Sequence, residues 1–175
     1  MLLTIAWLTT TSAHAASSAT DRLLAPPATC PGTAGASTAE QLATMRCLVG
    51  YDRAHAGVSK LHASTSLAQA GMLKLDADIR CGAFTHTPCG QPFDRVFVTA
   101  GFSTDGSYSA GENLAYGQDL LGSPWQVMQV WLASPEHRQV LLSADWTTFG
   151  LAVREDTTFL GGSHVALWAN EFAGP

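Results

Sequence analysis

Residues 149–172 read FGLAVREDTTFLGGSHVALWANEF, and the layout of the domain follows from this segment. Large apolar side chains alternate with smaller ones up to Val153, a period of two that predicts a β-strand. Gly161-Gly162 predicts a turn before a second apolar run from Val165 to Phe172, so we expect two strands that pair as a hairpin. The two faces of the second run are almost equally apolar, which indicates that both are covered. The segment therefore predicts a sheet between two layers of helices.

Two helices are predicted well before this hairpin. Thr38 is placed to cap the first, which should end at or before Gly57. Ser64 or Thr65 is placed to cap the second, and Cys81-Gly82 should end it. The expected core-facing positions repeat at helical spacing: Leu42, Met45 and Val49 in the first helix, and Ala68, Met72, Leu75 and Ile79 in the second.

A long loop and two further helices separate these helices from the hairpin. The stretch from Phe84 to Gly111 is rich in Gly, Pro, Thr, Ser and Asp and predicts an ordered loop, with one short helix at Pro92 to Thr99. Ser123-Pro124-Trp125-Gln126 is a helix start with a capping box, and Ser134-Pro135 starts another short helix, Glu136 to Leu142. The first of these two helices is expected to bury Val127, Val130 and Trp131.

Length and charge narrow the class of protein. A chain of 175 residues fits one domain, and a formal net charge of −5 with only nine Lys and Arg leaves no basic stripe for a phosphate backbone. We therefore expect no nucleic-acid partner and no polybasic membrane patch. No segment of the mature chain approaches the ~18 consecutive apolar residues of a membrane span, so no transmembrane segment is expected.

The N-terminus predicts export. An apolar run from Leu2 to Leu8 is followed by Ala13-His14-Ala15, a pattern that signal peptidase accepts, although no Lys or Arg precedes the run. We interpret residues 1–15 as a signal peptide cleaved near Ala15, which predicts a secreted protein. Residues 16–37 are predicted to be a flexible lead-in held at Cys30, and residues 38–175 to be the domain.

Four cysteines agree with an oxidising compartment. Three pairings are possible, and sequence proximity favours Cys30 with Cys47 and Cys81 with Cys89. A four-cysteine zinc site is the alternative, but the spacing contains no Cys-x-x-Cys pair.

Three polar motifs stand out between these elements. They are Phe84-Thr85-His86-Thr87, Gly111-Glu112-Asn113-Leu114-Ala115 and Trp131-Leu132-Ala133-Ser134-Pro135-Glu136-His137-Arg138. Together with Leu48-Val49, Arg53 and the strand at Phe149, their order resembles the CAP superfamily, above all bacterial SCP-like extracellular domains. The resemblance covers about Ala39 to Phe172. It implies an α+β fold, a three-layer α-β-α sandwich with a small, mostly antiparallel sheet and a large cleft.

The resemblance also implies which residues line that cleft. His86 matches the first histidine of the family, Glu112 the first glutamate and His137 the second histidine. Ser134 stands where many eukaryotic members have a second glutamate, so the acidic set of the family is incomplete here. Gly50 replaces the asparagine usual in the first helix.

The chemistry of this trio permits two interpretations. His137 in the first turn of a helix is expected to stay neutral beside the helix dipole, and two imidazoles with one carboxylate suit zinc or another divalent cation. Each residue also has a structural interpretation: His86 could bond a loop carbonyl, Glu112 could accept backbone N–H groups, and Ser134 could cap its helix. We expect His55, His62 and His164 to be surface residues.

Two functions of different classes follow. The first is a secreted, monomeric, non-enzymatic module that binds a small apolar ligand, such as a lipid or sterol, or an extracellular partner, in a metal-competent cleft. The second is a zinc-dependent hydrolase with Glu112 as general base on a water held by His86 and His137. A wall-associated structural module, in which the trio only holds loops in place, is the third possibility.

Overall fold

The structure is a computed structural model, and it describes residues 23–32, 35–102, 108–156 and 158–175. The predicted signal peptide therefore lies outside the described residues. The helices are α2 (Thr38–His55), α3 (Thr65–Cys81), α4 (Arg95–Thr99), α5 (Pro124–Ala133) and α6 (Pro135–Leu142). The strands are β1 (His62–Ala63), β2 (Ser109–Gln118), β3 (Thr148–Asp156) and β4 (Val165–Gly174), and three short 3₁₀ helices are η1 (Pro88–Gly90), η2 (Asp119–Gly122) and η3 (Phe159–Gly161).

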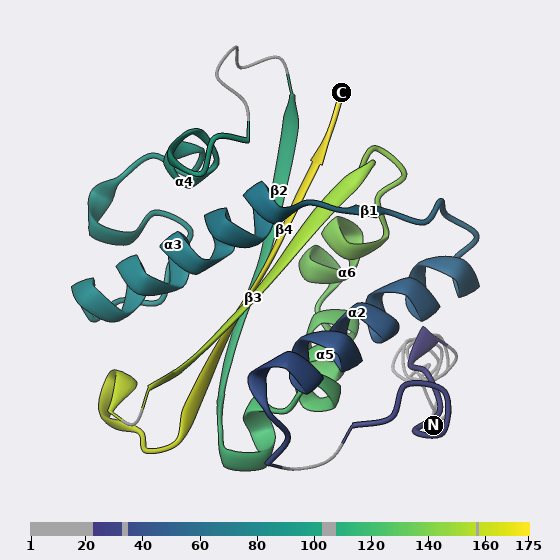
Figure 1. The fold of residues 1–175 in the computed structure, drawn as a ribbon, viewed down its shortest axis with the longest axis horizontal. Coiled ribbons are helices and arrows are strands. Elements are labelled where there is room, and N and C mark those ends of the chain that lie inside the picture. Colours follow the sequence, from purple (N-terminus) through teal and green to yellow (C-terminus); the bar gives the residue numbers. More distant parts are fainter. Residues whose placement is uncertain (1–22, 33–34, 103–107, 157) are drawn as a thin grey trace, which may run out of the picture.

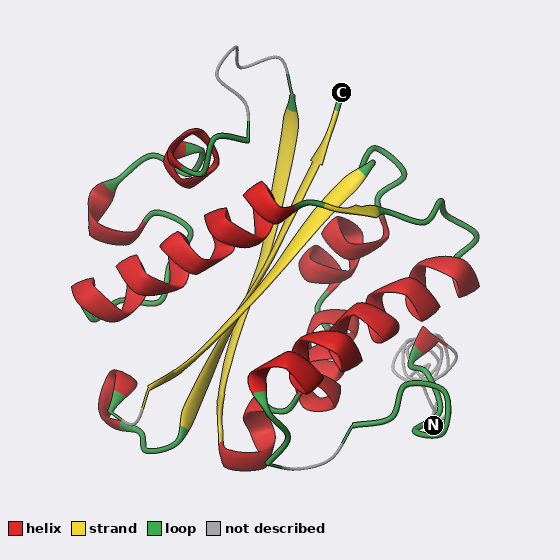
Figure 2. Ribbon diagram, in the orientation of Figure 1, coloured by secondary structure: helices red, strands yellow, loops and turns green. Residues whose placement is uncertain are grey.

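These elements form three layers around one sheet. The strand order is β1-β3-β4-β2, with β1 parallel to β3 and the other neighbours antiparallel. Helices α3 and α4 cover one face, and α2, α5 and α6 cover the other (Figures 1 and 2). All ten residues of β4 are buried. The predicted hairpin and the α+β sandwich are confirmed.

Serine side chains begin four of the helices. Ser37 caps α2 and forms a capping box with Glu40. The observed cap therefore lies one residue before Thr38, the residue predicted to be the cap. Ser64 caps α3, Ser123 caps α5 and Ser134 caps α6. In each case the hydroxyl accepts a backbone N–H that the first helical turn leaves free, as the sequence predicted for the last three.

Several details differ from the sequence expectation. Val130 is 56% exposed rather than buried, because the buried side of α5 is formed by its neighbours at helical spacing, Val127 and Trp131. Strand β2 is ten residues long and begins at Ser109, inside the stretch predicted to be a loop, and Glu112 lies within the strand. The two-residue strand β1 was not predicted.

The buried side of α3 is more polar than its predicted stripe. Leu75 is buried as expected, whereas Met72 and Ile79 are half-buried at the margin of the core. Lys74 and Asp78 are buried instead. The helix packs this closely because Gly150 of β3 has no side chain, and a Cβ there would collide with the α3 backbone.

Both predicted disulfides are confirmed, Cys30–Cys47 and Cys81–Cys89, which excludes a zinc site made of these four thiolates. Part of the predicted lead-in is also packed onto the domain. Ala25 is buried in the core together with Cys30, so the chain is held at more than the cysteine. None of the described helices is long and apolar enough to cross a membrane.

Candidate functional site

Two neighbouring rungs of the β2–β4 ladder carry polar side chains to opposite faces of the sheet. Glu112 pairs directly with Glu171, and Asn113 pairs with Asn170. Side chains alternate along a strand, and the next residue of β2, Leu114, packs with Leu75 of α3. The glutamate rung therefore faces α3, and the asparagine rung faces α5 and α6.

The loop after α3 brings His86 onto the glutamate rung. Gly82 ends α3 in the left-handed conformation, and the backbone N–H of Thr85 donates to Asp78 Oδ1 at 3.2 Å. This contact turns the chain back over the sheet. His86 Nδ1 then lies 2.6 Å from Glu112 Oε1, a charge-assisted hydrogen bond in which the ring nitrogen donates.

Lys74 binds both partners of the His86–Glu112 contact. Its Nζ lies 3.4 Å from Glu112 Oε2 and donates to the backbone carbonyl of His86. The side chains of Lys74 and Glu112 are 1% and 0% exposed, whereas that of His86 is 55% exposed. The Lys74–Glu112 ion pair is therefore buried, and of the three side chains only the His86 ring is exposed to solvent.

The carboxyl groups beside this pair favour protonation. Glu171 is fully buried, and no donor among the described side chains or backbone groups bonds to either of its oxygens. Burial and the facing charge of Glu112 raise the pKa of Glu171 well above its ordinary value, against the opposing effect of Lys74. Burial also raises the pKa of Asp78 to about 6, although the Thr85 N–H lowers it. We expect Glu171 to hold a proton that Glu112 can accept in a hydrogen bond.

The pKa values of the two histidines are shifted in opposite directions. The hydrogen bond to Glu112 is the largest effect on His86 and raises its pKa, although burial opposes the shift. Burial is the largest effect on His137 and lowers its pKa, and the charge of His86 lowers it further. The two rings are therefore close enough for their charges to interact. The prediction that His137 stays neutral agrees with this direction, but burial is its main cause rather than the helix dipole.

His137 approaches the strand through its backbone. Asn113 Nδ2 donates to the His137 carbonyl at 2.8 Å, which ties α6 to β2. The ring nitrogen His137 Nδ1 is buried and has no hydrogen-bond partner among the described residues. The structure thus places His86 and Glu112 in direct contact, and it places His137 nearby without a hydrogen bond from its ring to either.

Ser134 acts as a helix cap. Its hydroxyl accepts from the His137 backbone N–H at 3.4 Å and donates to Glu136 Oε2 at 3.0 Å. It therefore does not activate or contact the His137 ring. Arg138 donates to the Leu132 carbonyl at 3.0 Å. His55, His62 and His164 are exposed, as expected.

The described residues do not form a ready-made metal site at the predicted trio. Among the described residues, no three His, Cys, Asp or Glu side chains are placed to hold one ion together. Glu112 already faces an imidazole with one oxygen and the Lys74 ammonium with the other, so a divalent cation would meet a positive charge beside its only carboxylate. Binding of zinc or another divalent cation by this trio stays a prediction.

An aromatic group continues the site along β2. Tyr116 lies four residues after Glu112 on the same face of the strand, with its ring centroid 4.8 Å from Phe84 and 6.0 Å from Phe159. Tyr116 is 50% exposed. Because Phe84 and His86 lie in one loop, an exposed aromatic surface and an exposed imidazole adjoin the same strand. We refer to His86, Glu112, Phe84 and Tyr116 as the β2 site.

Three charged residues of the site were not predicted from the sequence: Lys74, Asp78 and Glu171. A signal was present for each. Lys74 and Asp78 are four residues apart on α3 and stand next to its core positions, where an unpaired charge is costly. Glu171 is the one carboxylate in an otherwise uncharged strand from Val165 to Gly174.

The chain has a CAP-like fold, because solved structures of SCP-domain and cysteine-rich secretory proteins superpose on it. An outer surface protein of Borrelia burgdorferi superposes with a TM-score of 0.66 at 18% identity, over 79% of this chain and 96% of that one. An extracellular SCP-domain protein of Bacillus anthracis gives 0.59 at 17% identity, over 82% of this chain and 45% of that one. A cysteine-rich secretory protein of Staphylococcus aureus gives 0.61 at 17% identity, over 81% of this chain and 40% of that one.

The chain thus spans less than half the length of the second and third of these proteins. No family model matches the sequence, and no curated protein matches it either. At such low identity the likeness concerns the fold.

Proposed function

We propose that this protein is an extracellular, monomeric, non-enzymatic binding module that takes a small amphipathic ligand, such as a fatty acid or sterol, at the β2 site. The observation that carries the proposal is the adjacency of an exposed imidazole, held by a buried carboxylate, and an exposed aromatic side chain on one edge strand. An apolar ligand body would contact Tyr116 and Phe84, and its polar group would bond to His86.

The location is supported by chemistry and by likeness of fold. Two disulfides form readily in an oxidising compartment, and two of the similar structures are described as extracellular or secretory proteins. The predicted signal peptide agrees with export.

Catalysis has less support than binding. Glu112 would have to act as a general base, yet its oxygens face an imidazole and an ammonium, and Ser134 is used as a cap. The zinc-dependent hydrolase remains the alternative, and the unpartnered, buried His137 nitrogen is the observation that favours it.

Calorimetric titration with dodecanoate and with cholesterol sulfate tests the proposal. We expect saturable binding of at least one probe, weakened about 10-fold or more by Tyr116→Ser and by His86→Ala, since each removes one half of the contact. Val130→Ser is the matched control, because Val130 is as exposed as Tyr116 but lies on α5. Equal weakening by the control, or no binding of either probe, would refute the proposal.

A second arm addresses the alternative. Zinc is titrated into the wild type, His86→Ala and His137→Ala, and ester and peptide turnover is measured. Turnover that requires zinc and is lost in both variants would establish the hydrolase instead. Ligand binding without turnover supports the binding module.

A further inference from the structure

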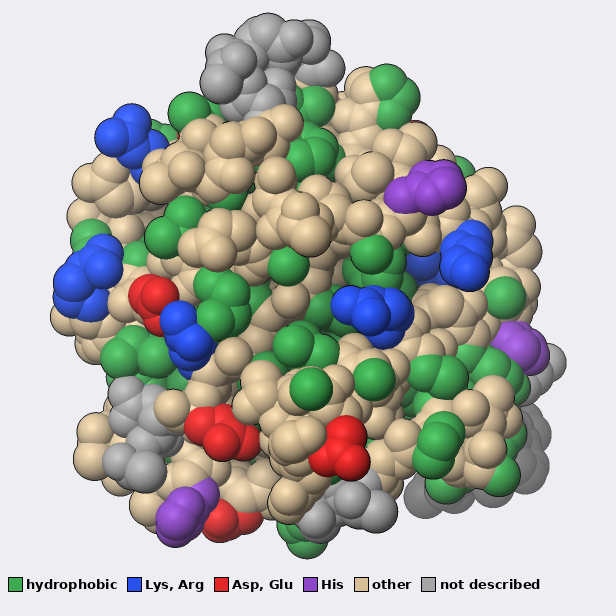
Figure 3. Space-filling model, viewed as in Figure 1, with side chains coloured by type: hydrophobic (Ala, Val, Ile, Leu, Met, Phe, Trp, Pro, Cys, Tyr) green, Lys and Arg blue, Asp and Glu red, His purple; other side chains and the backbone are tan. Residues whose placement is uncertain are grey.

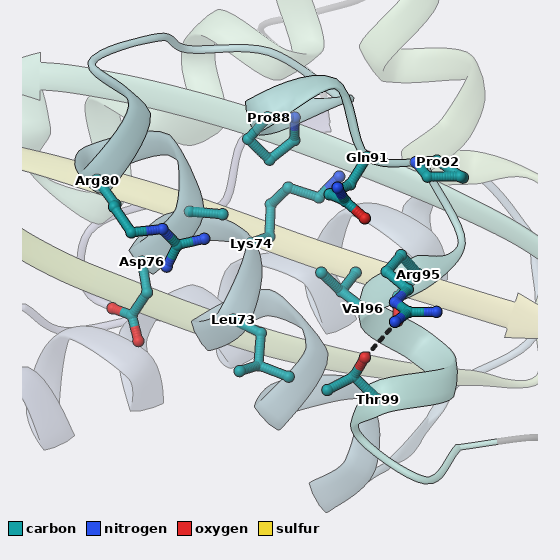
Figure 4. A pocket seen from close by; sticks show the side chains of 11 residues that line it. Leu73, Lys74, Asp76, Arg80, Pro88, Gln91, Pro92, Arg95, Val96 and Thr99 are labelled. Atoms are coloured by element: carbon teal, nitrogen blue, oxygen red, sulfur yellow. Dashed lines mark hydrogen bonds between the residues drawn. The ribbon is translucent and has the colours of Figure 1, made fainter.

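A second candidate site lies between α3 and α4. A pocket of about 290 Å³ separates α3 from α4, and its charged lining residues are Lys74, Asp76, Arg80 and Arg95 (Figure 4). Arg80 and Arg95 lie on opposite sides of the pocket, with Lys74 between them. The pocket is thus lined by three basic side chains and one acidic side chain.

Two of these four residues form ion pairs outside the pocket. Lys74 faces Glu112, and Asp76 accepts two hydrogen bonds from Arg154 at 2.7 and 3.2 Å. Neither Arg80 nor Arg95 has a carboxylate within ion-pair distance among the described residues. Arg80 Nη2 donates to the sulfur of Cys89 at 3.7 Å. Two uncompensated guanidinium groups therefore border a pocket of a protein whose net charge is −5.

The remaining walls are mostly apolar and well anchored. Leu73 and Val96 contribute from the two helices, and Pro88 and Pro92 come from the loop that closes one end. The Cys81–Cys89 disulfide ties that loop to the end of α3, so the pocket exists before a ligand arrives. A volume of about 290 Å³ is at the lower end of small-molecule sites and accommodates one aromatic ring with its substituent.

We propose that the pocket between α3 and α4 binds a small organic anion, an aromatic or short aliphatic carboxylate or phosphate. Its acidic group bonds to the guanidinium group of Arg80 or of Arg95, since either matches planar carboxylate and phosphate oxygens and the other adds positive potential across the pocket, and its apolar body packs between Leu73 and Val96. Lys74 lines this pocket and also pairs with Glu112, but Arg80 and Arg95 are not residues of the β2 site, so the two proposals can be tested by separate variants.

The test uses phenyl phosphate, benzoate, benzamide and inorganic phosphate as probes, with binding followed by NMR shifts of backbone amides. We expect phenyl phosphate or benzoate to saturate with shifts concentrated in residues 73–99. Benzamide, which keeps the ring without the charge, and inorganic phosphate, which keeps the charge without the ring, should each bind about 10-fold more weakly or worse. The double variant Arg80→Gln/Arg95→Gln should lose the same factor.

The matched control replaces two basic residues of another surface pocket, Arg46→Gln/Lys60→Gln. Neither residue lines the α3–α4 pocket, so this variant removes equal charge without touching it. Figure 3 shows Lys and Arg side chains on the α3–α4 side of this face and on its α2 side, so basic charge is not confined to one pocket. The proposal is overturned if the control weakens binding as much as the double variant, if the double variant binds like the wild type, or if benzamide binds equally well. Absence of saturable shifts in the wild type overturns it without any variant.

Discussion

The glutamate rung and the asparagine rung of the sheet are neighbours in β2 and β4, yet they solve the burial of polar groups in different ways. On the α3 side, Glu112 and Glu171 require a buried lysine and a proton to be tolerated. On the α6 side, Asn113 and Asn170 carry no charge, and Asn113 is bonded to a backbone carbonyl. The comparison teaches that only the charged rung is connected to solvent by a titratable side chain, His86.

Removal of the buried lysine should produce the largest effect. Lys74→Met keeps the apolar stem but leaves Glu112 and Glu171 without their cation, and breaking a buried pair costs about 3–5 kcal/mol. Urea unfolding at neutral pH measures the loss. A loss below about 1 kcal/mol would show that Lys74 does not stabilise the glutamate rung.

The pH dependence of stability should separate Asp78 from an exposed acid on the same helix. The folded protein keeps the Asp78 proton up to about pH 6, whereas the unfolded chain loses it near the ordinary aspartate pKa of 3.8. The contribution of the protonated Asp78 carboxyl to the free energy of unfolding is therefore fully present below pH 4 and is lost as the pH rises to about 6. A difference of about 2 pKa units corresponds to roughly 3 kcal/mol as an upper bound.

Asp78→Asn should accordingly gain stability relative to the wild type between pH 4 and pH 7, measured by urea unfolding at each pH. Asp76→Asn is the control. Its ion pair with Arg154 is well exposed, so a change within about 1 kcal/mol is expected. Parallel pH curves for Asp78→Asn and the wild type would contradict the assignment.

A smaller loss is expected on the neutral rung. Asn113→Ala removes the hydrogen bond to the His137 carbonyl and leaves a partly buried acceptor without its partner, which costs about 1–3 kcal/mol. Its size should not change with pH between 5 and 8, in contrast to the charged rung. A strong pH dependence of the Asn113→Ala effect would mean that the two rungs are not distinct.

The smallest effect should come from Val130. Because this side chain is 56% exposed, Val130→Ser should change the free energy of unfolding by no more than about 0.5 kcal/mol. A loss above 2 kcal/mol in urea unfolding would restore the sequence expectation that Val130 belongs to the core.

Sequence analysis recovered features that depend on neighbouring residues. Helix caps at Ser64 and Ser123, the β3–β4 hairpin and the two disulfides follow from short-range patterns, and all were found. Strand β2 was underestimated because its glycines and polar residues hide the alternation.

Long-range pairing was not accessible in the same way. The contact of His86 with Glu112 joins a loop and a strand 26 residues apart, and only the family resemblance suggested it. Lys74 and Glu171 each stand out in the sequence as a charge beside apolar positions, but only the register of β2 with β4 and the packing of α3 show that Glu112 is their common partner.

NMR titration of the imidazole rings tests most directly that a buried carboxylate holds His86 at the strand edge. We predict that His86 titrates above 6.5 and His137 below it, and that Glu112→Gln lowers the His86 value. A His86 pKa at or below that of His137 in the wild type would contradict the account, as would an unchanged His86 value in a folded Glu112→Gln variant.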